Sequence, residues 1–203
     1  MTNSSQLLVH GHSCCEVRTE KISLICDPWL LGSSYWRSWW NFPEPTDFNH
    51  LLDIWSKKDL LFVYITHLHW DHFHGPTLRN LIKHLKNTIF LIPETPEPRL
   101  RKDLASVVGK DKDIIELTHA KWLKLSSELS LLSFQTGIGF ADSILSISIS
   151  GKNILNMNDA KILPLSESHL LSLIPKPNYV LRSHSSANDR CCFRNQEGKK
   201  LDK

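Results

Sequence analysis

The sequence lacks several features that would each define a class of protein. No apolar run reaches the roughly 18–20 residues that a membrane-spanning helix needs. The first residues, Met1 to Gln6, carry no basic stretch ahead of an apolar run, so no signal peptide is predicted. Excess charge is also small, because 24 Lys and Arg face 21 Asp and Glu, which gives a net charge of +3. This balance argues against nucleic acid or an anionic membrane as the main partner.

Cysteines are few and poorly spaced for disulfide bonds. Five are present, and four of them form the adjacent pairs Cys14-Cys15 and Cys191-Cys192. The odd count, together with the rarity of bridges between neighbours, predicts free thiols and a reducing, cytoplasmic compartment. The sequence has no CxxC motif, and it lacks the paired C-x-H and C-x-x-H motifs that a Rieske iron–sulfur cluster requires.

What the chain does contain is typical of one folded domain. Of its 203 residues, 41% are hydrophobic and 22% are charged, so it can bury a sizeable core. We expect a single domain over residues 1–190, followed by a polar tail over residues 191–203. The counts that stand out are 11 His and 7 Trp.

The hydrophobic pattern predicts strands and helices in alternating blocks. Runs typical of strands occupy residues 7–10, 14–18, 22–26, 61–65, 88–92, 114–118, 122–125, 129–134, 144–149, 153–157 and 179–183. Apolar residues at helical spacing predict helices at 48–55, 76–85, 97–108 and 166–173. Thr46 or Asp47 would cap the first helix, and Gly151-Lys152 would form a hairpin turn. The order of these elements predicts an α/β sandwich, with two sheets face to face and helices outside.

Side chains that can bind a metal concentrate in one short segment, Thr66-His67-Leu68-His69-Trp70-Asp71-His72, which follows a predicted buried strand. Imidazole and carboxylate groups are ligands that suit zinc, iron or manganese. On an extended segment His67 and His69 point the same way, whereas Asp71 and His72 come after the chain turns and can reach a second ion. Two ions about 3.5–4 Å apart would make a hydroxide nucleophilic at neutral pH. The alternative is a solvated, histidine-rich loop.

This motif and several other segments resemble the metallo-β-lactamase fold superfamily. Gly11-His12-Ser13 resembles the early turn of lactonase-like and phospholipase-D-like members. Asp27-Pro28-Trp29-Leu30, Trp39-Trp40 and Leu155-Asn156-Met157-Asn158-Asp159 are similar to the metallo-β-lactamase-like part of CMP-N-acetylneuraminate hydroxylases. The resemblance spans roughly residues 8 to 190. It implies an αββα metallo-β-lactamase-like sandwich and leaves the substrate open.

The resemblance also implies a set of metal ligands. These are the residues His67, His69, Asp71, His72, Asp159 and His184. Asp159 matches the aspartate that bridges both metals, although an Asx turn is the alternative for it. His184 matches a late ligand, with an ordinary loop histidine as the alternative. Asp71 would also orient the attacking water, which makes it the candidate catalytic residue.

One superfamily ligand has no clear counterpart in the chain. A histidine usually lies between the motif and the bridging aspartate, and this interval offers only His119, Gln135 or Asp142. Its absence fits the hydroxylase-like branch and leaves open one or two divalent metal ions. Zinc is the first expectation, with iron or manganese as alternatives. The other histidines near the site, His10 and His12, are expected to pack or to support ligands more than to bind metal.

Five tryptophans fall within 27 residues of one another, and they are Trp29, Trp36, Trp39, Trp40 and Trp55. One interpretation is a loop packed over the edge of the sandwich. The other is an aromatic wall of a substrate pocket, formed by Trp36, Trp39 and Trp40, in which Arg37 would pair with a phosphate or carboxylate.

Three functional hypotheses follow. The first is a metal-dependent hydrolase that uses an activated hydroxide on an ester, lactone, amide or phosphodiester of a small molecule. The second is an iron-dependent, hydroxylase-like protein that acts on a sugar or nucleotide-sugar and takes electrons from a separate donor protein. The third is a degenerate domain that binds without turnover. The fold cannot rank them, because one fold hosts many chemistries.

Length places one more expectation on the fold. Only 44 residues follow Asp159, so the C-terminal half looks short for a four-layer sandwich. The chain would then be a natural minimal version, a truncation, or a homo-oligomer that borrows the missing layer. An open sheet edge and an exposed apolar face near residues 179–183 are the expected signs.

Overall fold

The computed structural model describes residues 4–110, 112–136 and 142–183. His184 and the tail predicted over residues 191–203 lie outside this part of the chain, and so do Cys191 and Cys192.

Two sheets form the centre of the described chain. The first sheet holds, in spatial order, β1 (Gln6–Gly11), β2 (Cys14–Arg18), β3 (Ile22–Cys26), β4 (Leu60–Tyr64), β5 (Thr88–Pro93) and β6 (Ile114–Leu117). The second sheet holds β11 (Tyr179–Arg182), β10 (Lys152–Asn158), β9 (Asp142–Ile149), β8 (Leu129–Thr136) and β7 (Trp122–Lys124). The helices are α1 (Phe48–Trp55), α2 (Gly75–His84), α3 (Arg99–Val108) and α4 (Pro164–Leu173).

The topology follows from the strand sequences. Strands β1 to β3 form an antiparallel meander, while β3 to β6 run parallel. Every residue of β3 is buried, as expected of a parallel strand that is covered on both faces. In the second sheet β7 to β10 are antiparallel, and β11 joins β10 in parallel. Carboxyl ends of β3, β4 and β5 therefore meet at one edge of the first sheet.

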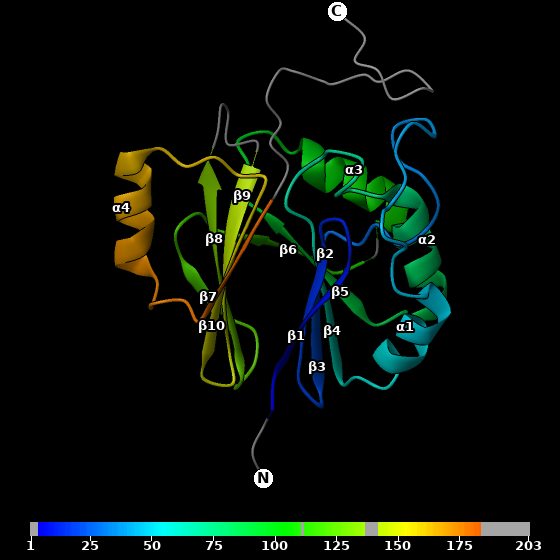
Figure 1. Cartoon of the computed structure of the whole chain (residues 1–203), viewed down its shortest axis with the longest axis horizontal. Helices are drawn as coiled ribbons and strands as arrows, with labels where there is room; N and C mark the ends of the chain where they lie inside the picture. Colours follow the sequence, from blue (N-terminus) through cyan, green and yellow to red (C-terminus); the bar gives the residue numbers. More distant parts are fainter. Residues whose placement is uncertain (1–3, 111, 137–141, 184–203) are drawn as a thin grey trace, which may run out of the picture.

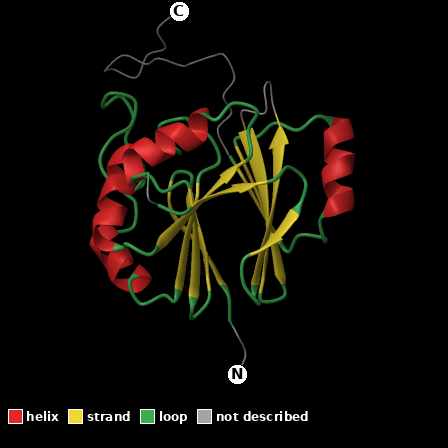
Figure 2. Cartoon of the chain, turned by 180° about the vertical axis from the view of Figure 1, so that it is seen from behind, coloured by secondary structure: helices red, strands yellow, loops and turns green. Residues whose placement is uncertain are grey.

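Three buried clusters hold four layers together. One lies between the first sheet and helices α1 to α3, a second lies between the two sheets, and a third lies between the second sheet and α4. Figure 1 shows these layers side by side, and Figure 2 shows from behind that the helices stay on the two outer sides. The predicted αββα sandwich is confirmed.

Local signals explain where the helices begin. Asp47, not Thr46, caps α1, since its carboxylate accepts a hydrogen bond of 2.8 Å from the backbone nitrogen of His50. His74 caps α2, and Pro76 occupies the first turn. Two predicted starts were wrong: α3 begins at Arg99, two residues late, and α4 begins at Pro164, two residues early.

The predicted hairpin turn at Gly151-Lys152 was also wrong by one residue. Lys152 already pairs with Ile149, and the turn consists of Ser150 and Gly151, with φ angles of 46° and 76°. A two-residue turn of this hand needs positive φ at both positions, which serine adopts only at a cost.

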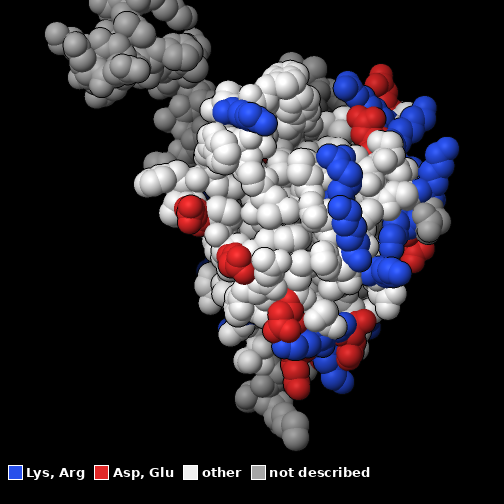
Figure 3. Space-filling model, turned by 90° about the vertical axis from the view of Figure 1, so that its right-hand side faces the viewer, with Lys and Arg blue, Asp and Glu red and all other residues white. Residues whose placement is uncertain are grey.

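The surface shows how the outer layers meet solvent. On the side that carries α1 to α3, Lys and Arg line one part of the face beside a broad area with few charges (Figure 3). At the opposite sheet, β11 is an edge strand of the described chain, and Tyr179 and Val180 are about half exposed. This matches the open edge expected near residues 179–183. None of the described helices is both long and apolar enough to cross a membrane.

Candidate metal centre

The polar cluster lies at the end of the sandwich where four segments meet. These are the turn between β1 and β2, the residue after β3, the motif after β4, and the end of β10. Because the carboxyl ends of β3 and β4 are neighbours in a parallel sheet, the residues after them are brought together.

Asp27 is the centre of this arrangement. It is fully buried, and its carboxylate accepts hydrogen bonds of 2.8 Å from both the backbone nitrogen and the hydroxyl of Thr66. The same carboxylate lies 3.1 Å from Nδ1 of His72 and accepts a bond of 3.2 Å from the amide of Asn158. Asp27 thus connects β3, β4 and the second sheet through one side chain.

His72 has one satisfied and one unsatisfied nitrogen. Its Nδ1 faces Asp27, whereas the buried Nε2 has no hydrogen-bond partner among the described residues. That Nε2 lies 3.4 Å from Oδ2 of Asp71 and 3.3 Å from Oδ2 of Asp159. Burial alone would lower the pKa of His72, but the surrounding carboxylates raise it to about 12. The position of Nε2 therefore favours a positive charge, which a bound cation would also supply.

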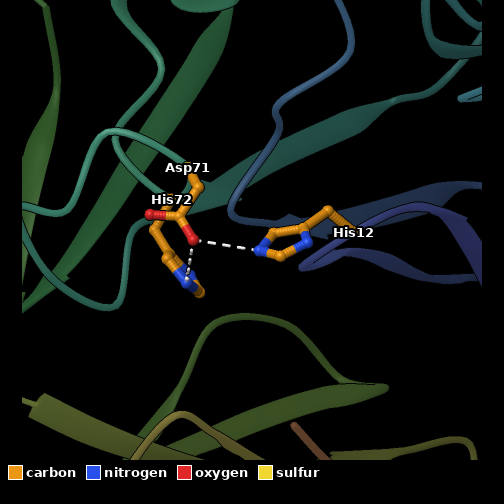
Figure 4. Close-up of side chains that lie close together, drawn as sticks. All are labelled: His12, Asp71 and His72. Carbon is orange, nitrogen blue, oxygen red and sulfur yellow. Dashed lines mark hydrogen bonds and ion pairs between the residues drawn. The ribbon is translucent and has the colours of Figure 1, made fainter. Parts of the chain in front are cut away.

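Both carboxylate oxygens of Asp71 have partners. Oδ2 lies 2.9 Å from Nε2 of His12, and Oδ1 accepts a bond of 2.7 Å from the phenol of Tyr35. Figure 4 shows His12 and His72 approaching the same carboxylate from different segments. Burial would raise the pKa of Asp71, yet the hydrogen bonds from His12 and Tyr35 and the nearby charge of His72 hold it well below its usual range.

His67 and His69 lie together, as the alternation rule predicted for an extended segment. Nε2 of His67 is 2.7 Å from Nδ1 of His69, and Nδ1 of His67 is 2.9 Å from the hydroxyl of Thr66. Burial and the nearby His72 lower the pKa of His67, so this imidazole favours its neutral form. Neutral imidazole is the form that binds metal.

Two sets of side chains could hold a metal ion, with ligand atoms all within 4.8 Å of one another. They are His12, Asp71 and His72, and His67, His72 and Asp159. The donors are imidazole and carboxylate groups. His72 belongs to both sets, and its Nε2 has no hydrogen-bond partner among the described residues. These residues fit a divalent ion such as zinc. Their role as ligands, and that of His69, stays a prediction.

Other candidate residues lie elsewhere. His119 contacts Gln135 and is not a member of either set. Asp142 begins β9, and its charge acts on the pKa of His67. His10 binds Glu16 at 2.7 Å and supports the first hairpin. The late ligand predicted at His184 falls outside the described residues.

The tryptophans divide into two groups. Trp29 and Trp55 are buried, whereas Trp36, Trp39 and Trp40 are exposed, with Trp36 at 83%. A loop packed over the sandwich edge therefore describes only part of this window.

A cavity of about 420 Å³ opens beside Trp36, and neither Trp39 nor Trp40 lines it. Its lining includes Trp36, Arg37, Trp70 and Arg79. A separate cavity of about 350 Å³ is lined by His12, His72 and Asp159, so it is this second cavity that opens on the polar cluster.

Three residues of the centre were missed or undervalued from the sequence. The sequence places Asp27 only in a segment that resembles the family, gives Tyr35 no role, and predicts that His12 packs or supports ligands more than it binds metal. The parallel order of β3 and β4 would have placed Asp27 beside the motif. No sequence signal placed Tyr35, because its position depends on a loop with positive φ.

Comparison with solved structures establishes the fold. The chain superposes on Igni18, a metallo hydrolase of the archaeon Ignicoccus hospitalis KIN4/I, with a TM-score of 0.61 and 18% identity, over 87% of this chain and 69% of that one. It superposes on the metallo-β-lactamase fold protein YhfI of Bacillus subtilis with a TM-score of 0.50 and 13% identity, over 76% and 57%. The chain has the metallo-β-lactamase fold.

The chain is also similar in sequence to parts of longer proteins. The chain is 30% identical over 133 residues to the cytidine monophosphate-N-acetylneuraminic acid hydroxylase of Asterias rubens, covering 66% of this chain and 20% of that protein. It is 28% identical over 165 residues to a candidate Rieske 2Fe-2S iron–sulfur protein of Mycolicibacterium smegmatis, covering 78% and 30%. The chain thus spans less than a third of these relatives. No protein-family model matches it.

Proposed function

We propose that this chain is a metal-dependent hydrolase that acts on an ester, lactone, amide or phosphodiester of a small molecule. The single observation that carries the proposal is the buried Nε2 of His72, which lacks a hydrogen-bond partner in the described chain and faces Asp71 and Asp159. A buried polar atom without a partner is costly unless a ligand satisfies it.

The proposed ligands of one or two divalent ions are His67, His69, Asp71, His72 and Asp159, with His184 as a further candidate. Bound there, such an ion would supply a hydroxide nucleophile at neutral pH and stabilise the oxyanion that forms. Asp27 holds Nδ1 of His72, which leaves Nε2 directed at the ion.

The substrate would enter beside the exposed aromatic loop. Trp36, Trp39 and Trp40 offer exposed apolar surface. Arg37 lines the same cavity as Trp36 and offers a guanidinium for an anionic group. Trp36→Ala is expected to raise KM more than it lowers kcat, because it removes binding surface and leaves the polar cluster intact. A fall in kcat with an unchanged KM would contradict this role.

The decisive experiment combines metal analysis with an activity panel. Purified protein should contain about one or two equivalents of zinc, and it should hydrolyse at least one substrate in a broad ester, lactone and phosphodiester panel. His69→Ala should lose both metal and activity, while the exposed His84→Ala should lose neither. Metal bound without any hydrolysis would contradict the hydrolase and leave a binding domain without turnover.

A second candidate is an iron-dependent, hydroxylase-like protein acting on a sugar or nucleotide-sugar. Its support is the named hydroxylase relative, together with Gln135 in the interval where a histidine is expected. Since this sequence has no Rieske motif, the electrons would come from a separate donor protein. Iron in the purified protein with oxygen uptake would favour this candidate, whereas zinc alone would exclude it.

Two further proposals concern the cellular compartment and the oligomeric state of the protein. The free thiols Cys14, Cys15 and Cys26 are buried, which is compatible with the cytoplasmic location proposed from the sequence. The half-exposed edge at β11 is compatible with a homo-oligomer, which size-exclusion chromatography with light scattering would test.

A further inference from the structure

We propose that His12 binds directly to the metal ion held by Asp71 and His72, so that the first turn of the chain completes one metal site. The proposal rests on the metal-dependent function above, and it assigns a ligand that the motif itself does not contain. The turn between β1 and β2 supplies His12, whereas Asp71 and His72 come from the loop after β4.

Distances between the ligand atoms support direct binding. Nε2 of His12 lies 2.9 Å from Oδ2 of Asp71, and Nε2 of His72 lies 3.4 Å from the same oxygen. Ligands that bind zinc tetrahedrally at 2.0–2.1 Å are separated from one another by about 3.3 Å. Both measured separations are close to that value, and one ligand atom from each of the three residues lies within 4.8 Å of the others.

The hydrogen bonds of Asp71 and His72 engage their other side-chain atoms and leave Oδ2 of Asp71 and Nε2 of His72 for a cation. Oδ1 of Asp71 accepts the bond from Tyr35, so Oδ2 is the oxygen that faces the two histidines. Nδ1 of His72 is held by Asp27, so its Nε2 is the free nitrogen. A hydrogen bond between His12 and Asp71 alone would leave that buried nitrogen with only its longer contacts of 3.4 Å to Asp71 and 3.3 Å to Asp159.

The turn also holds His12 in place. The hydroxyl of Ser13 donates 2.8 Å to the backbone oxygen of Asp71, which ties the turn to the motif loop. The His12 ring packs edge-on against Trp29 and Trp39, at centroid distances of 5.3 Å and 6.3 Å. Its side chain is 38% exposed, so an incoming ion reaches it from solvent. A ligand fixed in this way loses little side-chain entropy on binding metal.

The test is a pair of substitutions measured by metal competition. Full-length protein, stripped of metal, would be titrated with zinc against a chromogenic chelator for wild type, His12→Ala, His12→Gln and the exposed control His50→Ala. Glutamine keeps an N–H that can donate to Asp71, so it replaces a hydrogen bond and not an imidazole ligand. We expect both His12 variants to lower the zinc affinity of this site more than about 100-fold. Such a loss exceeds the effect of removing a residue that only hydrogen-bonds to a metal ligand.

Each result decides between ligand and hydrogen-bond partner. If His12→Gln binds zinc within about tenfold of wild type, His12 is only a hydrogen-bond partner and the proposal is overturned. If wild type itself binds no metal, the proposed function fails, and that outcome is distinct from the first. Urea unfolding of each variant confirms that the fold is retained.

A second variant gives a signature that only direct ligation produces. His12→Cys titrated with cadmium should show a thiolate-to-cadmium absorption band in addition to any band that wild type, with its five cysteines, shows. Cadmium binding to His12→Cys without a new band would overturn the proposal.

Discussion

The phenol of Tyr35 donates a hydrogen bond of 2.7 Å to Oδ1 of Asp71, a residue 36 positions later in the chain. This bond connects the exposed aromatic loop to the polar cluster. The loop reaches it through three consecutive residues with positive φ, Tyr35, Trp36 and Arg37, at 45°, 53° and 69°. Such a conformation costs roughly 1–2 kcal/mol per residue, so the surrounding contacts must stabilise it.

Removing this phenol should weaken metal binding and leave the fold intact. Tyr35→Phe keeps the ring that stacks on Trp70 but removes the donor to Asp71. We expect about tenfold weaker zinc affinity, the usual effect of losing a partner of a ligand. Competition titration measures it, with the exposed Tyr179→Phe as the control. Unchanged affinity would show that the bond does not orient Asp71.

Metal binding should release protons and strengthen as pH rises. In the metal-free protein the pKa of His72 is raised to about 12, so this imidazole is charged at neutral pH and must lose a proton to bind an ion. Zinc affinity should therefore rise about tenfold per pH unit for each proton released. Calorimetry in two buffers with different ionisation enthalpies counts the protons, and a count of zero would contradict this account.

The raised pKa of His72 also makes the stability of the metal-free protein depend on pH. Because the folded-state pKa of His72 lies above its ordinary value of 6.5, the charged imidazole stabilises the metal-free protein. That contribution is complete below about pH 6.5 and is lost as the pH rises toward 12.

Glu16 should make the protein sensitive to acid. It is fully buried, bound by His10 and by the hydroxyl of Ser23 at 2.7 Å each. Burial opposes ionisation, but these bonds hold the pKa of Glu16 below its ordinary value of 4.5. Its stabilisation is therefore complete above that value and falls as the pH drops further.

Glu16→Gln tests this dependence. At about pH 7 the variant should be less stable by about 2 kcal/mol, the contribution of hydrogen bonds to a charged group. In strong acid the gap to wild type should narrow, as measured by urea unfolding at both pH values. The exposed Glu20→Gln, on the same hairpin, serves as the control. A gap that stays constant with pH would mean that charge is not the cause.

Tyr64 should stabilise the contact between the two sheets. This buried residue of β4 lies 3.0 Å from the hydroxyl of Ser133 and 2.8 Å from that of Ser143, both in the second sheet. Tyr64→Phe should cost about 1–2 kcal/mol, because buried hydroxyls lose a partner. In a double-mutant cycle with Ser133→Ala the two losses should not add. Full additivity would show that the residues do not interact.

Much of the fold could be predicted because burial leaves a strong periodic pattern. The predicted strand and helix ranges matched the layers closely, since β3 and β4 are apolar throughout and α1 has clear helical spacing. Boundaries failed where local chemistry decides, as at Ser150-Gly151, where positive φ sets the turn.

The site was predictable where residues form a short motif or match a segment of the family that the chain resembles. His67 to His72 form a recognisable motif, and the end of β10 points to Asp159. The contributions of Asp27, Tyr35 and His12 depend on tertiary contacts, namely parallel strand order, a strained loop and a turn packed on the motif. Such contacts leave no periodic signal in a single sequence.

Asp27 has a further consequence through its bonds to Thr66 in the first sheet and Asn158 in the second. The carboxylate that orients His72 also joins the two halves of the sandwich, so an ion bound by His72 would also stabilise the contact between the halves. In a cell short of metal, the chain would then be lost to proteolysis as well as inactive, and its abundance would report the metal supply.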